Sequence, residues 1–151
     1  MHFITESLLV GNINDACEPP TQISAVLLVA AEFTLRPPGW LLFGRIPFSE
    51  YAEAEPVLLD QAVSWIEQHL SGNRVMVCCR AGMGRSVSVA MAYLCCVQGM
   101  EYAEVLKLVM RRRPGAIPLP HLEEAIAQVR LLREARTTKP SNPTSPPAPD
   151  L

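Results

Sequence analysis

The chain has 151 residues and a net charge of −2, with 49% hydrophobic and 19% charged residues. This length and composition fit one folded domain with its own core, and they exclude a disordered chain and a broadly basic nucleic-acid-binding protein. The five cysteines include two pairs of sequence neighbours, which suits free thiols in a reducing compartment. With no apolar run long enough to span a bilayer and no pattern typical of a signal peptide, we expect a cytoplasmic protein.

Short apolar runs alternate with helical patterns along the chain. The run at residues 23–29 is almost free of polar side chains, as in a parallel strand that is buried on both faces. A helical pattern begins at Pro56, because proline is favoured in the first turn. The alternation predicts an α/β fold, a twisted central sheet with helices on both faces. Strands are expected at residues 7–10, 23–29, 40–46 and 74–78, and helices at residues 56–70, 86–97, 101–113 and 121–136, with a brief helix near Ala16.

Composition changes near the C-terminus. Residues 137–151 contain five prolines and almost no large apolar side chain. A segment of this composition cannot form a packed core, so we expect a proline-rich disordered tail. The folded domain is then residues 1–136, and no internal repeat divides it.

One segment carries a chemical signal. Residues 79–86 read Cys-Arg-Ala-Gly-Met-Gly-Arg-Ser and lie between an apolar strand and an uncharged helix. A glycine-containing loop at a helix N-terminus can turn backbone N–H groups inward and bind a phosphate or sulfate dianion. The positive potential of these N–H groups favours the thiolate of Cys79, and the Arg85 guanidinium can bind two phosphoryl oxygens. Together these residues predict phosphoryl transfer through a cysteinyl-phosphate intermediate.

The spacing Cys-x5-Arg-Ser after an apolar strand resembles the protein tyrosine phosphatase superfamily, and the flanking sequence is similar to its small dual-specificity phosphatases. The resemblance runs from Ile4 to Ile126. It implies the dual-specificity phosphatase fold, hydrolysis of phosphomonoesters, and no metal or organic cofactor. The flanking matches are residues 8–12, 23–30, 45–47, 92–94 and 112–114.

The resemblance also implies roles for residues of the loop. Cys79 matches the nucleophile, and Arg85 matches the phosphate-binding arginine. Ser86 matches the hydroxyl that hydrogen-bonds the sulfur and eases breakdown of the intermediate. The phosphate cradle is expected from the backbone amides of Arg80, Ala81, Gly82, Met83, Gly84 and Arg85.

Three positions depart from the family pattern. The family uses an aspartate as general acid, and the matching position here is Glu50, with Glu53 and Glu55 as alternatives. The residue before the nucleophile is Cys78 rather than histidine, which removes one influence on the acidity of the nucleophilic thiol. Leu119 stands where the family often has asparagine, so a supporting hydrogen bond near the loop is in question.

Other cysteines and cations have plainer interpretations. Cys95 and Cys96 lie on the uncharged helix, and we expect them to pack in the core. The basic run Arg111-Arg112-Arg113 suits the negative C-terminal end of its helix, with attraction of an acidic substrate as the alternative.

The expected partner is a phosphorylated protein or peptide, and a shallow pocket is expected to admit phosphotyrosine as well as phosphoserine and phosphothreonine. A phosphoinositide substrate is disfavoured because the loop has no lysine. An RNA 5′-phosphatase is disfavoured because the composition offers no broad basic surface. A catalytically weak phosphopeptide-binding module stays open as a non-enzymatic alternative. We expect no nucleic-acid or membrane partner, and the sequence indicates no oligomeric state.

Overall fold

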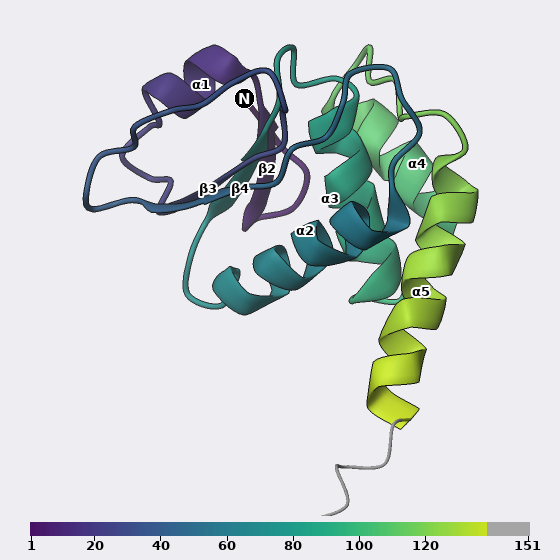
Figure 1. Ribbon diagram of the computed structural model, residues 1–151. Helices are drawn as coiled ribbons and strands as arrows, with labels where there is room; N and C mark the ends of the chain where they lie inside the picture. The colour runs from purple at the N-terminus through teal and green to yellow at the C-terminus, as the bar shows by residue number, and fades with distance from the viewer. Residues whose placement is uncertain (139–151) are drawn as a thin grey trace, which may run out of the picture.

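The computed structural model describes residues 1–138, which form a mixed sheet with helices on both faces (Figure 1). Its strands are β1 (His2–Phe3), β2 (Leu8–Gly11), β3 (Ala25–Leu28), β4 (Leu42–Arg45) and β5 (Val75–Cys78). They lie in the order β1-β2-β5-β3-β4, and β1 pairs antiparallel with β2 while every other pair is parallel. The α/β fold expected from the sequence is confirmed.

The helices of the described residues are α1 (Ile13–Cys17), α2 (Pro56–His69), α3 (Arg85–Cys96), α4 (Tyr102–Arg112) and α5 (Leu122–Thr138). On one face of the sheet α1 packs against β2 and β5, whereas α2 and α3 cover the other face (Figure 1). Both α4 and α5 pack against α3. Each of the four long helices expected from the sequence is present, with ends shifted by at most two residues.

The strands at the two edges of the sheet both differ from expectation. The β1 strand has only two residues, too few for a periodic pattern, and the sequence did not predict it. The β4 strand is shorter than the predicted run at residues 40–46. The cause is a turn before it, closed by a 3.1 Å hydrogen bond from the Leu41 N–H to the Pro38 carbonyl, which leaves Trp40 exposed outside the sheet.

The central strand β5 positions the functional residues. It lies between β2 and β3, and its last residue, Cys78, pairs with Gly11 on one side and Leu28 on the other. All residues of these three strands are buried, because helices cover both faces. The carboxyl ends of parallel strands meet at one edge of the sheet, where open α/β folds bind ligands.

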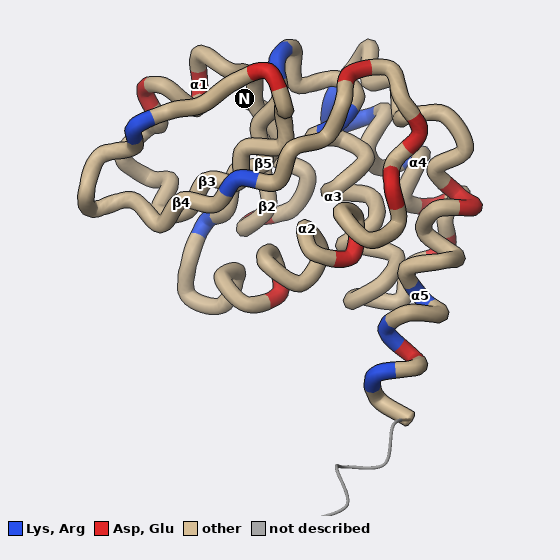
Figure 2. The backbone as a smooth tube through the Cα atoms, in the orientation of Figure 1, with Lys and Arg blue, Asp and Glu red and all other residues tan. Residues whose placement is uncertain are grey.

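The absence of charge in α3 after Arg85 is explained by the place of this helix in the core. Every residue of α3 from Arg85 to Cys95 is buried between the sheet and the outer helices. Charged residues are instead spaced along the exposed α5 (Figure 2), where Arg136 pairs with Asp60 of α2 at 2.6 Å.

The predicted tail lies mostly outside the described residues. Thr137 and Thr138 belong to α5, two residues past the predicted end of the folded domain, and residues 139–151 are not described. The disordered tail therefore stays a prediction. Within residues 1–138, no helix has the length and apolar character needed to cross a membrane.

Candidate active site

The loop of residues 79–84, here called the cysteine loop, connects β5 to α3. Cys79 opens it and is only 2% exposed. Its sulfur lies 3.3 Å from the Ser86 hydroxyl, and hydrogen bonding by this hydroxyl and by the backbone N–H groups of Ser86 and Gly82 favours the thiolate. Burial raises the pKa of the Cys79 thiol, but these hydrogen bonds and the Arg85 charge outweigh it, so the pKa falls below its ordinary value.

The tight turn of the cysteine loop requires glycine at one position. Gly82 has a φ of +71°, in the left-handed region that other residues rarely adopt. A Cβ added there would lie 2.8 Å from the Gly11 carbonyl oxygen. That oxygen accepts a 3.3 Å hydrogen bond from the Cys79 N–H, so the loop is held close to the end of β2.

The carbonyl groups of the cysteine loop bond to donors around its outside. Since planar trans peptides direct C=O and N–H in opposite directions, outward carbonyls turn the N–H groups toward the centre. This arrangement suits an anion cradle formed by the N–H groups of residues 81–85, and the cradle stays a prediction. The bonds are Ile13 N–H to Arg80 O (3.2 Å), Arg113 Nη2 to Ala81 O (3.4 Å), Arg113 Nε to Gly82 O (3.1 Å), Ile117 N–H to Met83 O (2.8 Å), and the Ser88 N–H and hydroxyl to Gly84 O (2.9 and 2.7 Å).

Arg85, the first residue of α3, is 2% exposed and pairs with Glu32. Nη1 donates to Glu32 Oε2 at 2.6 Å, Nη2 donates to Oε1 at 2.5 Å, and Nη1 also donates to the Phe48 carbonyl at 3.1 Å. A guanidinium carries five N–H donors. The Nε–H and the second Nη2–H remain, and they lie on one edge, which matches two phosphoryl oxygens.

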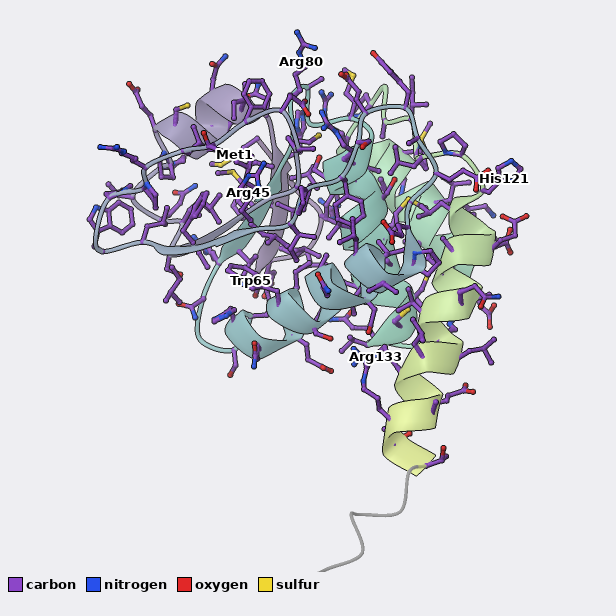
Figure 3. All side chains as sticks on the ribbon, viewed as in Figure 1. Met1, Arg45, Trp65, Arg80, His121 and Arg133 are labelled. Carbon is purple, nitrogen blue, oxygen red and sulfur yellow. The ribbon has the colours of Figure 1, made fainter. Side chains whose placement is uncertain are left out.

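Glu32 is a site residue that the sequence reasoning missed. Its loop is held by Arg45, whose Nε donates to the Phe33 carbonyl and whose Nη2 donates to the Ala31 carbonyl, both at 2.8 Å. Arg45 reaches this loop from the end of β4 (Figure 3). One signal was available: Glu32 follows the buried run of β3, a neighbour of β5, on the edge where the strands end.

A cavity of about 380 Å³ lies over the cysteine loop, and Cys79 and Glu50 both line it. Glu50 Oε2 lies 3.5 Å from Arg80 Nη1, and Arg80 projects outward from the loop (Figure 3). Neither alternative acid lines the cavity: Glu53 Oε1 lies 3.6 Å from His121 Nε2, and Glu55 precedes α2 without a side-chain hydrogen bond to the helix. The other lining residues are Tyr51, Ala81, Met83, Gly84, Arg85, Ile117, Pro118, Leu119 and Pro120.

Two of the departures from the family pattern have a local structural account. Cys78 is fully buried at the end of β5, and burial raises the pKa of its thiol well above the ordinary value. Leu119 supports the loop with its backbone: its N–H donates to the Ser88 hydroxyl at 2.9 Å, and that hydroxyl donates to Gly84 O. Among residues 1–138, no cluster of three or more histidine, cysteine, aspartate or glutamate residues could hold a metal ion.

Comparison with known proteins agrees with this geometry. The family model described as "Dual specificity phosphatase, catalytic domain" matches residues 12–132. Dual specificity protein phosphatase 1B of Arabidopsis thaliana is 32% identical over 123 residues, which cover 78% of this chain and 74% of that protein. Dual specificity protein phosphatase 8 of Homo sapiens is 30% identical over 116 residues, which cover 71% of this chain and 19% of that longer protein.

Solved structures show the same fold at lower sequence identity. Human DUSP28 is 20% identical with a TM-score of 0.77, covering 90% of this chain and 99% of that one. A mouse putative dual specificity phosphatase complexed with zinc tungstate is 24% identical with a TM-score of 0.74, covering 90% and 89%. PTPMT1 in complex with PI(5)P is 15% identical with a TM-score of 0.72, covering 90% and 97%.

Proposed function

The chain belongs to the dual specificity phosphatase family of cysteine-based hydrolases, and we propose that it dephosphorylates proteins with Cys79 as the nucleophile. One observation carries the proposal. The Cys79 sulfur lies 3.3 Å from the Ser86 hydroxyl, and the backbone N–H groups of Ser86 and Gly82 help to lower the pKa of its thiol, below a cavity that Arg85 also lines. A thiolate held by donors beside a guanidinium fork suits attack on a phosphoryl dianion.

In the first step, the Cys79 thiolate attacks phosphorus and forms the S–P bond while the P–O bond to the leaving group breaks. The free edge of Arg85 binds two phosphoryl oxygens, and the inward N–H groups of the cysteine loop share the remaining charge. Glu50, in its protonated form, gives its proton to the leaving oxygen, which departs as a hydroxyl.

In the second step, water attacks the phosphorus of the cysteinyl-phosphate. The Glu50 carboxylate takes a proton from that water, and the S–P bond breaks to release inorganic phosphate. The Ser86 hydroxyl donates to the departing sulfur and stabilises the thiolate that re-forms. The enzyme returns to its starting state without a metal or organic cofactor.

The lining of the cavity supports a phosphorylated peptide as substrate. Most lining side chains are apolar, among them Tyr51, Met83, Ile117 and Leu119, and no lysine is present. Such walls favour the phosphotyrosine ring and admit the shorter phosphoserine and phosphothreonine. A phosphoinositide headgroup carries several anionic groups, and Glu50 would repel them.

One assay set tests the proposed function. Wild-type protein, Cys79→Ser and Cys95→Ser are compared on p-nitrophenyl phosphate, on phosphotyrosine and phosphothreonine peptides, and on PI(5)P vesicles. We expect Cys79→Ser to lose at least about 10⁴-fold in kcat, because the nucleophile is absent. Cys95→Ser changes a thiol of equal burial within α3, away from the cysteine loop, and should keep the activity. Equal turnover by wild type and Cys79→Ser would overturn the proposal, and faster turnover of PI(5)P would overturn the peptide assignment.

The general acid is tested separately. The rate of phosphate-ester hydrolysis is measured against pH for Glu50→Gln, Glu53→Gln and Glu55→Gln. We expect only Glu50→Gln to lose the fall in rate at high pH, because that limb reports deprotonation of the acid. Loss of the same limb in Glu53→Gln alone would assign the acid to Glu53.

A further inference from the structure

Arg113 is the one side chain that bonds to two successive carbonyls of the cysteine loop among the described residues. The sequence interpretation assigned it, with Arg111 and Arg112, to the negative end of α4. In the structure Arg113 follows α4, and its guanidinium reaches the loop. Nε donates to Gly82 O at 3.1 Å, Nη2 to Ala81 O at 3.4 Å, and Nη1 to its neighbour Pro114 O at 2.9 Å.

The two loop carbonyls belong to peptide units whose N–H groups face the other way. The Ala81 carbonyl shares its plane with the Gly82 N–H, and the Gly82 carbonyl shares its plane with the Met83 N–H. The Gly82 N–H faces the Cys79 sulfur and is one of the groups that lower the pKa of its thiol. A guanidinium that holds both carbonyls from outside therefore fixes the direction of two donors inside.

Gly82 makes this external restraint necessary. Its left-handed φ of +71° is accessible to glycine, but glycine is also the most flexible residue in the chain. The carbonyls at the rim of the loop, on Arg80, Met83 and Gly84, each accept from a backbone N–H, with a second donor from the Ser88 hydroxyl at Gly84. The two carbonyls around Gly82 bond to Arg113 alone within residues 1–138.

We propose that Arg113 is a positioning residue of the phosphate site, which aims the Gly82 and Met83 N–H groups at the Cys79 sulfur and the bound anion without touching either. The proposal rests on the proposed function of the cysteine loop as a phosphate cradle. If Arg113 orients these N–H groups, its loss should weaken anion binding and also lower the reactivity of the Cys79 thiol, because the same N–H groups act on the anion and on the sulfur.

The experiment compares Arg113→Ala, Arg113→Lys and Arg112→Ala. Arg112 is the matched control, because it is an exposed neighbouring cation with no hydrogen bond or ion pair in the described part of the chain. Tungstate affinity is measured by titration calorimetry, and the rate of Cys79 alkylation by iodoacetamide is followed against pH. Circular dichroism sets a temperature at which each variant is folded.

We expect Arg113→Ala to bind tungstate about tenfold more weakly, a loss typical of removed hydrogen bonds to a charged site. Its alkylation curve should move to higher pH, because the thiolate loses an aligned donor. Arg113→Lys keeps the charge without the planar fork and should recover only part of both effects. Arg112→Ala should stay within about twofold of wild type, as for a surface change that touches no loop group.

Three results would overturn the proposal: Arg113→Ala binding and reacting like wild type, Arg113→Lys restoring both readouts in full, or Arg112→Ala matching Arg113→Ala. The last two would assign the effect to charge alone. If Arg113→Ala fails to fold, weaker tungstate binding by Arg113→Lys supports positioning, and unchanged binding contradicts it. Neither readout needs turnover, so a wild type that binds tungstate but hydrolyses no ester would refute the proposed function separately.

Discussion

Two equally buried cysteines lie near the two ends of α3, and the pKa values of their thiols are shifted in opposite directions. Cys79, just before the helix, and Cys95, near its last turn, are both 2% exposed. The pKa of the Cys79 thiol is lowered despite burial, because donors surround the sulfur. Burial raises the pKa of Cys95 to about 11, against which the charge of Arg130 counts for less.

Burial alone therefore does not decide the chemistry of a thiol in this chain. At the N-terminal end of α3, the unpaired backbone N–H groups of a helix and a hydroxyl compensate for lost water. At the other end burial is the largest effect on Cys95, and the neutral thiol is favoured. The following variants disturb the groups around Cys79 and Arg85 or test whether the Cys95 thiol is unreactive.

The largest effect is expected from Gly82→Ala. The new Cβ would lie 2.8 Å from the Gly11 carbonyl oxygen and force a shift of the loop that carries the donors. We expect kcat/KM for p-nitrophenyl phosphate to fall about 100-fold, equivalent to about 2.7 kcal/mol. Gly72→Ala is the control, since Gly72 has a similar φ of +77° with no atom within 4 Å. It should cost about 1 kcal/mol of stability and leave kcat/KM unchanged. A Gly82→Ala enzyme with wild-type kinetics would contradict this account of the turn.

Glu32→Ala should have the next largest effect. Without its carboxylate the Arg85 fork loses two hydrogen bonds that fix its orientation. We expect KM to rise about tenfold with a smaller change in kcat, because phosphate binding depends on the fork in the ground state as well. Glu18→Ala changes a carboxylate with no hydrogen bond or ion pair among the described residues, and it should leave both constants unchanged. A fall in KM for Glu32→Ala would mean that Glu32 competes with substrate for Arg85.

Ser86→Ala removes one donor from Cys79 and keeps the backbone N–H groups. At pH 6.5 we expect iodoacetamide to alkylate Cys79 about fivefold more slowly than in wild type, as for one lost hydrogen bond of about 1 kcal/mol. Mass spectrometry of the modified peptides distinguishes Cys79 from Cys95, and Cys95 should stay unmodified in both proteins. Rapid alkylation of Cys95 at this pH would break the comparison between the two ends of α3.

The smallest effect concerns stability rather than catalysis. The unfolded Cys95 thiol loses its proton near its ordinary pKa of 9.0, whereas the folded thiol keeps its proton until about pH 11. The folded state therefore binds more protons in this window, and stability falls as pH rises through it. In Cys95→Ser the fall in urea midpoint between pH 9 and pH 11 should be shallower than in wild type. An identical fall in both proteins would show that Cys95 does not contribute to this loss of stability.

Contacts between residues that are close in the sequence were predicted, and contacts between distant residues were missed. The β5–loop–α3 segment has its residues side by side, so the local pattern predicted the cradle and the closeness of Ser86 to Cys79. Glu32 lies far from Arg85 in sequence and meets it only because β3 and β5 pair. Arg113 was assigned to its own helix because a helical pattern contains no information about which loop lies beyond its end.

The donors around the cysteine loop come from both ends of the described domain. Ile13 lies beside the first strands, while Arg113 and Ile117 lie between the last two helices. An anion that binds only the assembled loop must therefore stabilise the fold as a whole. By mass action, tungstate at 100 times its Kd would raise the free energy of unfolding by about 2.7 kcal/mol. A thermal shift thus reports occupancy of the site for any anion, whether or not it is hydrolysed.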